Sequence, residues 1–386
     1  MQMLDKMLNV LPGWTTGETS ERADGSEYVL VVPGMTDLAR SLERDVWGRC
    51  LPEGRKVGTA GHVVAEDFMR RRLKEVGCVP YKGRKFDLDY RSGRQNLKNL
   101  VGVVRGRKRS LPPLLIGAHY DSVIKAPCAD DNGAAVAICL ALAEILVGGE
   151  KLERDVIVAI FDAEEPPYFS SSSMGSETFY AEQLDDRGVH FAMIFDLVGH
   201  DVSVPTAALP KFGKLLKGVP GVGDFDLSLP VIGNAVFMTG AESHPSLPGM
   251  LDGTDVPSGL KLMATLNKYV GDMSDHGVFR CNDVPYLFFS CGRWAHYHQP
   301  TDTPDRLNYR KMARITHLAA RLLLQADTEK FDSDAGTSDT LDYESDCLRS
   351  ALGPLYPMAL KLAGVPEIRT RAHMDDFVRA LMATGL

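Results

Sequence analysis

Three apolar, β-rich runs that each end in His, Asp or Glu constrain the fold of this chain more than any other feature of its sequence. The runs and the polar residues that follow them are 114–118 before His119 and Asp121, 155–161 before Glu164 and Glu165, and 191–195 before Asp196. Helical patterns separate the runs, which indicates parallel strands joined by helices. Because ligands of such folds bind beyond the carboxyl ends of the strands, these polar residues are expected to meet there.

The remaining patterns agree with an α/β fold. We expect a mixed, largely parallel central sheet with helices on both faces, plus a helical C-terminal extension. The apolar runs 99–104 and 114–118 predict neighbouring strands, and 284–289 predicts the last strand. Apolar residues at helical spacing predict helices over 36–49, 58–75, 132–147, 175–184, 211–217, 258–270 and 305–324. Thr303 is expected to be the N-cap of the last of these, with Pro304 at its first position.

Changes in composition divide the chain into three predicted segments. Residues 1–57 are expected to pack on the core without carrying chemistry, and residues 58–325 form the domain that contains the polar strand ends. Residues 326–386 begin with an acidic, Ser/Thr-rich stretch, 327–346, that is typical of a linker. Helical spacing returns after it and predicts the C-terminal extension.

Composition also limits the classes of partner. The net charge of −8 and the lack of a dominant basic face argue against nucleic acid. No apolar run is judged long enough to span a bilayer, and the N-terminus lacks the basic start and apolar core of a signal peptide. The seven cysteines are scattered and include no CxxC, which favours reduced thiols. We therefore expect a cytoplasmic protein, while the sequence is silent on oligomeric state.

The polar strand ends, together with His298 after the last strand, form a ligand set for a pair of divalent metal ions. Imidazole and carboxylate groups are zinc ligands, and a pair of ions needs a carboxylate that bridges them. Adjacent glutamates at a strand end point in different directions, so one can bind metal while the other takes a proton from water. Each residue alone is a weak signal, since a strand-end Asp is more often a helix cap. Together they predict a two-metal hydrolase.

These motifs resemble metallopeptidase family 28, the co-catalytic di-zinc aminopeptidases of the bacterial leucyl aminopeptidase type, whose fold is shared with glutaminyl cyclases. The resemblance covers about residues 58–324. The matching motifs, in the order of the family, are HYDS at 119–122, DDNG at 130–133, EE at 164–165 followed by GS at 175–176, Asp196, SDH at 274–276, and His298 leading into DTPD at 302–305. The segment between Glu165 and Gly175 is longer than is usual in the family, so substrate preference is not transferred.

The resemblance implies a role for each matching residue. The implied ligands are His119 and Asp196 for one zinc ion, Glu165 and His298 for the other, and Asp131 as the bridge; cobalt or manganese could replace zinc. Glu164 is the implied general base, and Asp121 is implied to orient His119 through its far ring nitrogen. Tyr297 is implied to stabilise the oxyanion. The bond between Asp131 and Asn132 is implied to be a cis peptide bond.

Several nearby polar residues have simpler interpretations. The expected roles are a turn contact for Asp130, a buried packing position for Cys128, a structural hydrogen bond for His276, and capping of the last helix with orientation of the His298 loop for Asp302 and Asp305. His296 is a weaker ligand candidate than His298, because the spacing to the downstream DTPD motif matches the family from His298.

The function implied by the resemblance is a zinc-dependent aminopeptidase that acts on a peptide or small amide substrate. One alternative is a glutaminyl-cyclase-like acyltransferase, but cyclases usually have Trp where this chain has Tyr297 and lack Asn132-Gly133. Another is a carboxypeptidase or amide deacylase, in which Arg280 or Arg293 would bind a carboxylate. A non-catalytic binding module would typically have lost ligands, and this chain keeps all five.

Overall fold

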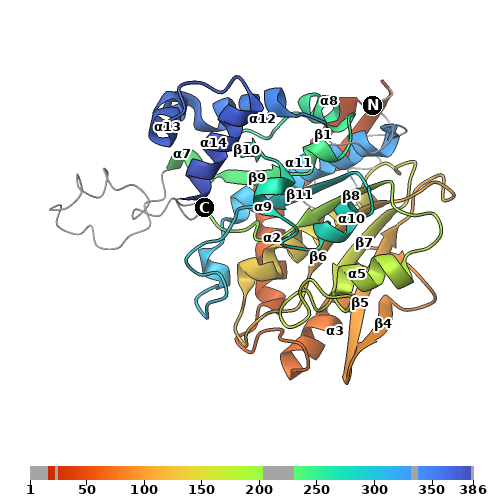
Figure 1. Ribbon diagram of the computed structural model, residues 1–386. Helices are drawn as coiled ribbons and strands as arrows, with labels where there is room; N and C mark the ends of the chain where they lie inside the picture. Colours follow the sequence, from red (N-terminus) through yellow and green to blue (C-terminus); the bar gives the residue numbers. More distant parts are fainter. Residues whose placement is uncertain (1–15, 22–24, 203–229, 332–337, 384–386) are drawn as a thin grey trace.

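The computed structural model describes residues 16–21, 25–202, 230–331 and 338–383, and its centre is a nine-stranded mixed sheet (Figure 1). The predicted helix over 211–217 lies outside the described residues. In order across the sheet, the strands are β10 (Lys261–Ala264), β9 (Ala235–Thr239), β11 (Tyr286–Ser290), β8 (Phe191–Phe195), β6 (Leu114–His119), β7 (Val156–Phe161), β5 (Gln95–Val104) and β3 (Val79–Pro80), with β4 (Asp87–Ser92) also paired to β5.

The four strands at the centre of the sheet, β11, β8, β6 and β7, are mutually parallel. Strand β5 joins β7 in antiparallel pairing, and β9 joins β11 in the same way. The prediction that the runs 99–104 and 114–118 are neighbours is wrong, because β7 lies between β5 and β6. Apolar composition marks a strand as buried, but it carries no information about the order of strands in the sheet.

Side chains alternate between the two faces of the sheet, and each face buries a separate apolar cluster. One face packs against α2 (Met35–Arg49), α3 (Ala60–Glu75), α4 (Ala135–Gly148) and α11 (Tyr309–Thr328). The other face packs against the turn Phe179–Gln183 and α10 (His276–Cys281), while α5 (Gly175–Thr178) leads into that turn and contacts β5. The metal-type residues at the carboxyl ends of the parallel strands therefore lie at one edge of a sheet that is covered on both sides.

Helix α4 and the turn before it contradict the expectation that no run is long enough to span a bilayer. Residues Ala129–Gly148 are long and apolar enough to cross a membrane by length and composition, although the sequence was judged to hold no such run. In the structure, 83% of the most apolar 18-residue window of this stretch is buried inside the protein, where α4 contacts the sheet, α2 and α11. A central core helix passes the same test of length and composition.

Before the main domain, β1 (Thr16–Glu21) and β2 (Glu27–Val32) form an antiparallel pair, and α2 packs against α4 and α11. The proposed boundary at residue 57 stays a prediction. All seven cysteines are free thiols, as expected.

Two predicted helices differ from the structure. Residues 258–270 contain strand β10, which pairs with β9, and only the short helix α9 (Asn267–Val270). A short apolar run suits either element, and here pairing with β9 decides. Thr303 and Pro304 open a 3₁₀ turn, Pro304–Arg306, while α11 begins at Tyr309. Its cap is Asn308, whose side-chain oxygen accepts a hydrogen bond from the backbone N–H of Lys311 at 2.9 Å.

The C-terminal extension consists of α12 (Leu341–Leu352), the 3₁₀ turn Gly353–Leu355, α13 (Tyr356–Ala363) and α14 (Arg371–Met382), which gather at the β10 end of the sheet (Figure 1). The predicted linker over 327–346 is wrong at both ends, because α11 continues to Thr328 and α12 begins at Leu341. Acidic residues misled the prediction. Glu344 is buried in α12 and forms an ion pair with Arg371 at 2.8 Å, so its charge does not oppose helix packing.

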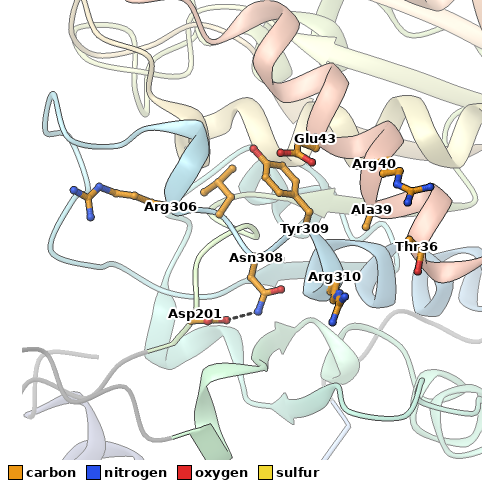
Figure 2. Close-up of a pocket in the computed structure, with 10 residues that line it drawn as sticks. Thr36, Ala39, Arg40, Glu43, Asp201, Arg306, Asn308, Tyr309 and Arg310 are labelled. Carbon is orange, nitrogen blue, oxygen red and sulfur yellow. Dashed lines mark hydrogen bonds between the residues drawn. The ribbon is translucent and has the colours of Figure 1, made fainter.

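The remaining helices are α7 (Pro230–Gly233) and α8 (Leu247–Asp252), with a 3₁₀ turn, Ala241–Ser243, between β9 and α8. A hollow of about 460 Å³ lies between α2 and the start of α11 (Figure 2). There the side-chain amide of Asn308 donates to Asp201 at 2.7 Å. Neither group of candidate metal ligands found among the described residues contributes to this hollow, so it is separate from the site described next.

Candidate metal centre

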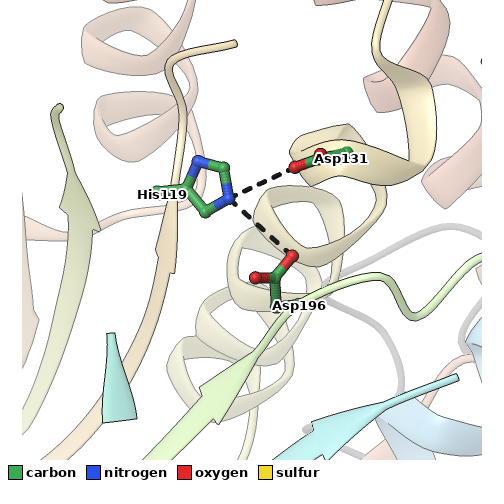
Figure 3. Close-up of side chains that lie close together, drawn as sticks. All are labelled: His119, Asp131 and Asp196. Carbon is green, nitrogen blue, oxygen red and sulfur yellow. Dashed lines mark ion pairs between the residues drawn. The ribbon is translucent and has the colours of Figure 1, made fainter. Parts of the chain in front are cut away.

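Two groups of candidate metal ligands lie at the carboxyl ends of the central strands. His119 is the last residue of β6, Asp196 follows β8, and both lie beside Asp131 from the turn before α4 (Figure 3). Asp131 also belongs to the second group, with Glu165 after β7 and His298 after β11. Within each group, the candidate ligand atoms all lie within 4.8 Å of one another. The structure thus brings together all five residues that the sequence suggested as ligands.

Asp131 stands between the two groups and directs one carboxylate oxygen to each. Its Oδ1 atom lies 3.4 Å from Nε2 of His119, and its Oδ2 atom lies 3.1 Å from Nε2 of His298. Asp131 lies in the turn Ala129–Ala134, and its peptide bond to Asn132 is cis, as the resemblance implied. The side-chain amide of Asn132 donates to the backbone oxygen of Phe195, which ties this turn to the end of β8. A carboxylate in this position can bridge two ions.

The polar atoms that face each other in these groups fit a pair of bound cations. Nε2 of His119, Nε2 of His298 and Oδ1 of Asp196 are buried and form no hydrogen bond with a described residue. Buried polar atoms normally have partners, so three such atoms in one place call for a ligand. Two imidazoles with three carboxylates are a donor set that zinc, cobalt and manganese all accept. The residues present therefore fit the pair of metal ions that the sequence implied.

Asp121 positions groups on two strands at once. Its Oδ1 atom lies 3.3 Å from Nδ1 of His119, which leaves Nε2 of that ring facing the ligand cluster. The same carboxylate accepts hydrogen bonds from the backbone N–H groups of Glu164 at 3.0 Å and Glu165 at 3.1 Å. Glu165 lies in the second group of ligands, whereas Glu164 lies in neither and its Oε2 atom is 3.8 Å from Nε2 of His119. The two glutamates thus have the separate positions that a ligand and a base require.

Arg55 supports the Asp131 turn, and sequence reasoning missed it. Its guanidinium is buried and donates to the backbone oxygens of Tyr120 at 2.7 Å, Pro127 at 2.6 Å and Cys128 at 2.8 Å, with a longer bond to that of Asp131 at 3.3 Å. Residues 1–57 were expected to carry no chemistry, yet this side chain links the end of β6 to the metal turn. An isolated arginine in an irregular stretch gives no signal of such a role.

Asp302 holds the same turn from the other side. Its Oδ1 and Oδ2 atoms accept hydrogen bonds from the backbone N–H groups of Asp130 at 2.9 Å and Asp131 at 3.1 Å. Capping of the last helix by Asp302 and Asp305 is therefore wrong, because Asn308 caps α11. The other role expected for Asp302, orientation of the His298 loop, agrees with its contacts, which tie that loop to the Asp131 turn. The N-cap position of α11 lies beyond Leu307, out of reach of a side chain that already binds two backbone amides.

Asp130 has the turn contact predicted for it and a partner that was not predicted. Its carboxylate accepts from the backbone N–H of Gly199 at 2.6 Å and binds Nδ1 of His200 at 2.5 Å. The His200 ring stacks on Trp294 with ring centres 4.7 Å apart. This chain of contacts connects the metal turn, the loop after Asp196 and the loop before His298. Cys128 is buried, as expected, and it belongs to neither ligand group.

Burial and like charges shift the pKa values of the acidic groups at this site. Burial raises the pKa of Glu164 well above its ordinary value, and the charges of Asp196 and Asp275 raise it further against the opposing charge of His119. Burial also raises the pKa of Glu165 to about 7. For Asp131 burial has the same tendency, but its ion pairs with His119 and His298 outweigh it and lower the pKa. Burial thus raises the pKa of both glutamates, whereas the two imidazoles keep the carboxyl of Asp131 acidic.

Two residues of the SDH motif differ in their surroundings. Asp275 is buried, and its burial raises its own pKa to about 7. His276 lies in neither ligand group, and its Nε2 atom is 3.0 Å from Oδ1 of Asn267 and 3.2 Å from the backbone oxygen of Gly271. Its ring stacks on Phe288 with ring centres 4.0 Å apart. His276 therefore makes the structural hydrogen bond predicted for it.

Replacing His276 with Gln is expected to make the protein less sensitive to acid. Burial lowers the pKa of His276 from 6.5 to about 4, so between these values the unfolded chain binds a proton that the folded chain does not. The contribution of His276 to the free energy of unfolding is fully present above pH 6.5. As the pH falls towards 4, protonation of this residue in the unfolded chain lowers that free energy by roughly 3 kcal/mol. Urea unfolding at pH 7 and pH 4.5 should therefore give a smaller loss for His276→Gln than for the wild type. His373→Gln is the control and should lose as much stability as the wild type. An equal loss of stability in the wild type and in His276→Gln would contradict a buried, neutral His276.

Four of the five candidate ligands, Asp131, Glu165, Asp196 and His298, line a cavity of about 890 Å³. Glu164 and Tyr297 face the same cavity, and the Tyr297 ring stacks on His298 with ring centres 3.7 Å apart. Much of the remaining wall is apolar and comes from β9, β10, β11, α12 and α14.

His296 is not in either ligand group, and its Nδ1 atom is 2.7 Å from Oγ1 of Thr301.

Comparison with known proteins identifies relatives of this chain in sequence and in structure. The model of the family described as Peptidase family M28 matches residues 99–323. The chain is 31% identical over 224 residues to the Uncharacterized protein YfbL of Escherichia coli (strain K12), which covers 55% of this chain and 66% of that protein. The LapA aminopeptidase of Legionella pneumophila is similar in structure, with a TM-score of 0.58, 15% identity, and coverage of 76% of this chain and 74% of that chain. A glutaminyl cyclase of Porphyromonas gingivalis has a TM-score of 0.53, 16% identity, and coverage of 74% and 97%.

These likenesses differ in what they establish. The solved structures are distant in sequence, so they show the fold, and they include both an aminopeptidase and a cyclase. The chain spans just under two thirds of YfbL, and 9% of the vacuolar membrane protease of Schizosaccharomyces pombe, to which it is 33% identical over 78 residues. The family match covers more than half of the chain and includes all five candidate ligands.

Proposed function

Since this chain belongs to peptidase family M28, we propose that it is a zinc-dependent exopeptidase, and that it acts as an aminopeptidase on peptides or small amides. The observation that carries this proposal is the position of Asp131, whose two carboxylate oxygens face different groups of ligands. His119 and Asp196 would hold one ion, and Glu165 and His298 the other. When bound, two zinc ions supply Lewis acidity for activating water and polarising a carbonyl.

The protein groups around the site have separate tasks in hydrolysis. Glu164 takes a proton from the attacking water and later gives it to the leaving amine, as the scissile C–N bond breaks. Its position supports this role, because its Oε2 atom lies 3.8 Å from Nε2 of His119 while Glu164 belongs to neither ligand group. Tyr297 donates its hydroxyl hydrogen to the oxyanion that forms on the substrate carbonyl. Asp121 keeps His119 in the tautomer that presents Nε2 to the cluster.

The test is mass spectrometry of a mixed peptide panel after incubation with the zinc-loaded protein. The panel includes peptides with N-terminal Gln, and each peptide has an N-acetylated copy as its control. We expect loss of one N-terminal residue at a time from the free peptides and none from the acetylated ones. Loss of ammonia from the Gln peptides alone would mean a cyclase and would overturn the proposal. Trimming from the other end would mean a carboxypeptidase.

One observation favours that carboxypeptidase or deacylase as the second candidate function. Of the two arginines considered, Arg280 is committed to Asp272 through two contacts of 2.6 Å. Arg293 faces the cavity, its guanidinium lies 5.1 Å from the ring centre of Tyr297, and no carboxylate among the described residues forms an ion pair with it. A cation in this place can bind the carboxylate of a substrate.

The Arg293→Ala variant separates the two candidates. If a substrate carboxylate binds Arg293, the variant should raise KM about 10–100-fold for peptides with a free C-terminus, and not for their amidated copies. Under the aminopeptidase proposal, KM should change equally for the free and the amidated peptides. Arg280→Ala is the matched control.

A further inference from the structure

The active-site cavity has an apolar wall built by segments outside the matched family region. Met374, Phe377 and Val378 of α14 are buried and line this cavity, and so does Leu348 of α12. All four lie beyond residue 323, where the match to the family ends. Strand residues such as Met263 and Phe288 also line the cavity. The C-terminal extension thus completes a cavity that begins at the metal ligands.

Polar contacts hold α14 in place over the cavity. Asp375 lies on the face of α14 that meets α9, where it accepts from Nζ of Lys268 at 2.9 Å and from the hydroxyl of Tyr269. Arg371 at the start of α14 binds both carboxylate oxygens of Glu344 in α12, at 2.9 and 2.8 Å. These contacts pair the charges of Asp375 and Arg371. The face of α14 that lines the cavity is therefore apolar.

The charges in the cavity wall are distributed unevenly. Apart from the carboxylates at the metal centre, Glu344 is the one described carboxylate of the wall, and it is neutralised by Arg371. Arg293 lies beside Tyr297, at the metal end. The α14 side chains in the wall, Met374, Phe377, Val378, Leu381 and Met382, are thioether, aromatic and aliphatic groups, so they offer a ligand neither an ion pair nor a hydrogen bond. A volume of about 890 Å³ falls in the upper part of the range for ligand pockets, about 300–1,000 Å³.

We propose that this cavity accepts a large apolar group attached to the scissile amide of the substrate, and that α14 is the element that selects for it. The proposal rests on the proposed function, since the metal centre defines where the amide lies. Such a group could be the side chain of an N-terminal residue or an acyl chain. Methionine-rich walls adapt to such groups because the thioether side chain is flexible and polarisable.

The first test measures binding without turnover. Isothermal titration calorimetry follows acetyl, hexanoyl and decanoyl hydroxamic acids added to the zinc-loaded protein. Each buried methylene should tighten binding about fourfold. In Met374→Trp, which narrows the cavity, decanoyl hydroxamate should bind at least about tenfold more weakly, and acetyl hydroxamate within about twofold of the wild type. Arg379→Ala, at an exposed position of the same helix, is the control and should change neither.

Several outcomes would overturn this proposal. Affinity that does not depend on chain length, or equal weakening of both ligands by Met374→Trp, would mean that the cavity does not hold the apolar group. If Met374→Trp fails to fold by circular dichroism, Phe377→Ala replaces it, and its expected result is a loss of chain-length dependence. Decanol added to the metal-free protein is a further probe. It should bind more tightly than hexanol even if the proposed function is wrong, so failure of the metal chemistry and failure of the cavity proposal are distinguishable.

Cleavage assays then identify the source of the apolar group. Preference for a long-chain aminoacyl 4-nitroanilide over the glycyl compound supports an N-terminal side chain, and cleavage of N-decanoyl-leucine supports an acyl chain. Fastest cleavage of the glycyl compound, with no cleavage of N-decanoyl-leucine, contradicts the proposal.

Discussion

Replacing Glu164 with Gln is expected to lower kcat about 10²–10⁴-fold while the protein keeps its zinc. Glu164 lies beside the candidate metal ligands without belonging to either group, and its Oε2 atom is 3.8 Å from Nε2 of His119. An amide of the same shape removes the proton acceptor but leaves the five ligands intact. Steady-state kinetics on the best substrate of the panel measures the loss, and mass spectrometry under native conditions counts the bound ions.

The neighbouring residue supplies a contrast for this prediction. Glu165→Gln removes a candidate ligand, so it should lose zinc as well as activity, because an amide oxygen is a weaker ligand than a carboxylate. Glu182→Gln, at an exposed position, should change neither quantity. Near-normal kcat in Glu164→Gln would refute the assignment of the general base. Loss of zinc in Glu164→Gln would instead make Glu164 a ligand.

Replacing Arg55 with Met is expected to destabilise the protein by about 3–5 kcal/mol, because it leaves buried backbone oxygens without donors. These are the oxygens of Tyr120, Pro127, Cys128 and Asp131. The turn that carries Asp131 then loses a support, so zinc affinity should fall about 10–100-fold. Thermal unfolding of the metal-free protein and zinc titration with a competing chelator measure the two effects.

The controls for Arg55 separate a local effect from a general one. Arg84→Met, at an exposed position, should shift neither the unfolding temperature nor the zinc affinity. Arg55→Lys keeps the charge, but its side chain cannot reach all four oxygens. Its unfolding temperature and zinc affinity should therefore lie between those of Arg55→Met and the wild type. If Arg55→Met unfolds at the wild-type temperature and binds zinc normally, the role assigned to this residue is wrong.

Three of the five candidate ligands could be identified from the sequence because each follows a local pattern. His119, Glu165 and Asp196 follow apolar runs, and such runs in an α/β chain become buried strands whose carboxyl ends share one edge of the sheet. His298 and Asp131 needed the resemblance as well, since no periodic pattern points to either. The cis bond after Asp131 was likewise implied by the resemblance alone.

The supports of the metal centre could not be found in the same way. Arg55 is 76 residues from Asp131 in sequence, and Asp302 is 171 residues away. Their contacts are backbone amides and carbonyls, which every residue possesses, so no residue type at the other end marks the pairing. The error about Asp302 shows the consequence. A Thr-Pro-Asp sequence is typical of a helix start, and the tertiary contact with the Asp131 turn competes with that local role.

By itself, the sequence determined the class of fold, most of the strands and helices, and the residue types that can hold metal, because these follow from local apolar periodicity and side-chain chemistry. The tertiary structure decided which strands are neighbours, how Asp131 faces two ligand groups, and that α14 closes an apolar cavity over them. Those features depend on contacts between segments far apart in the chain. Such contacts form when whole apolar faces are buried together, and no short stretch of sequence specifies its partner.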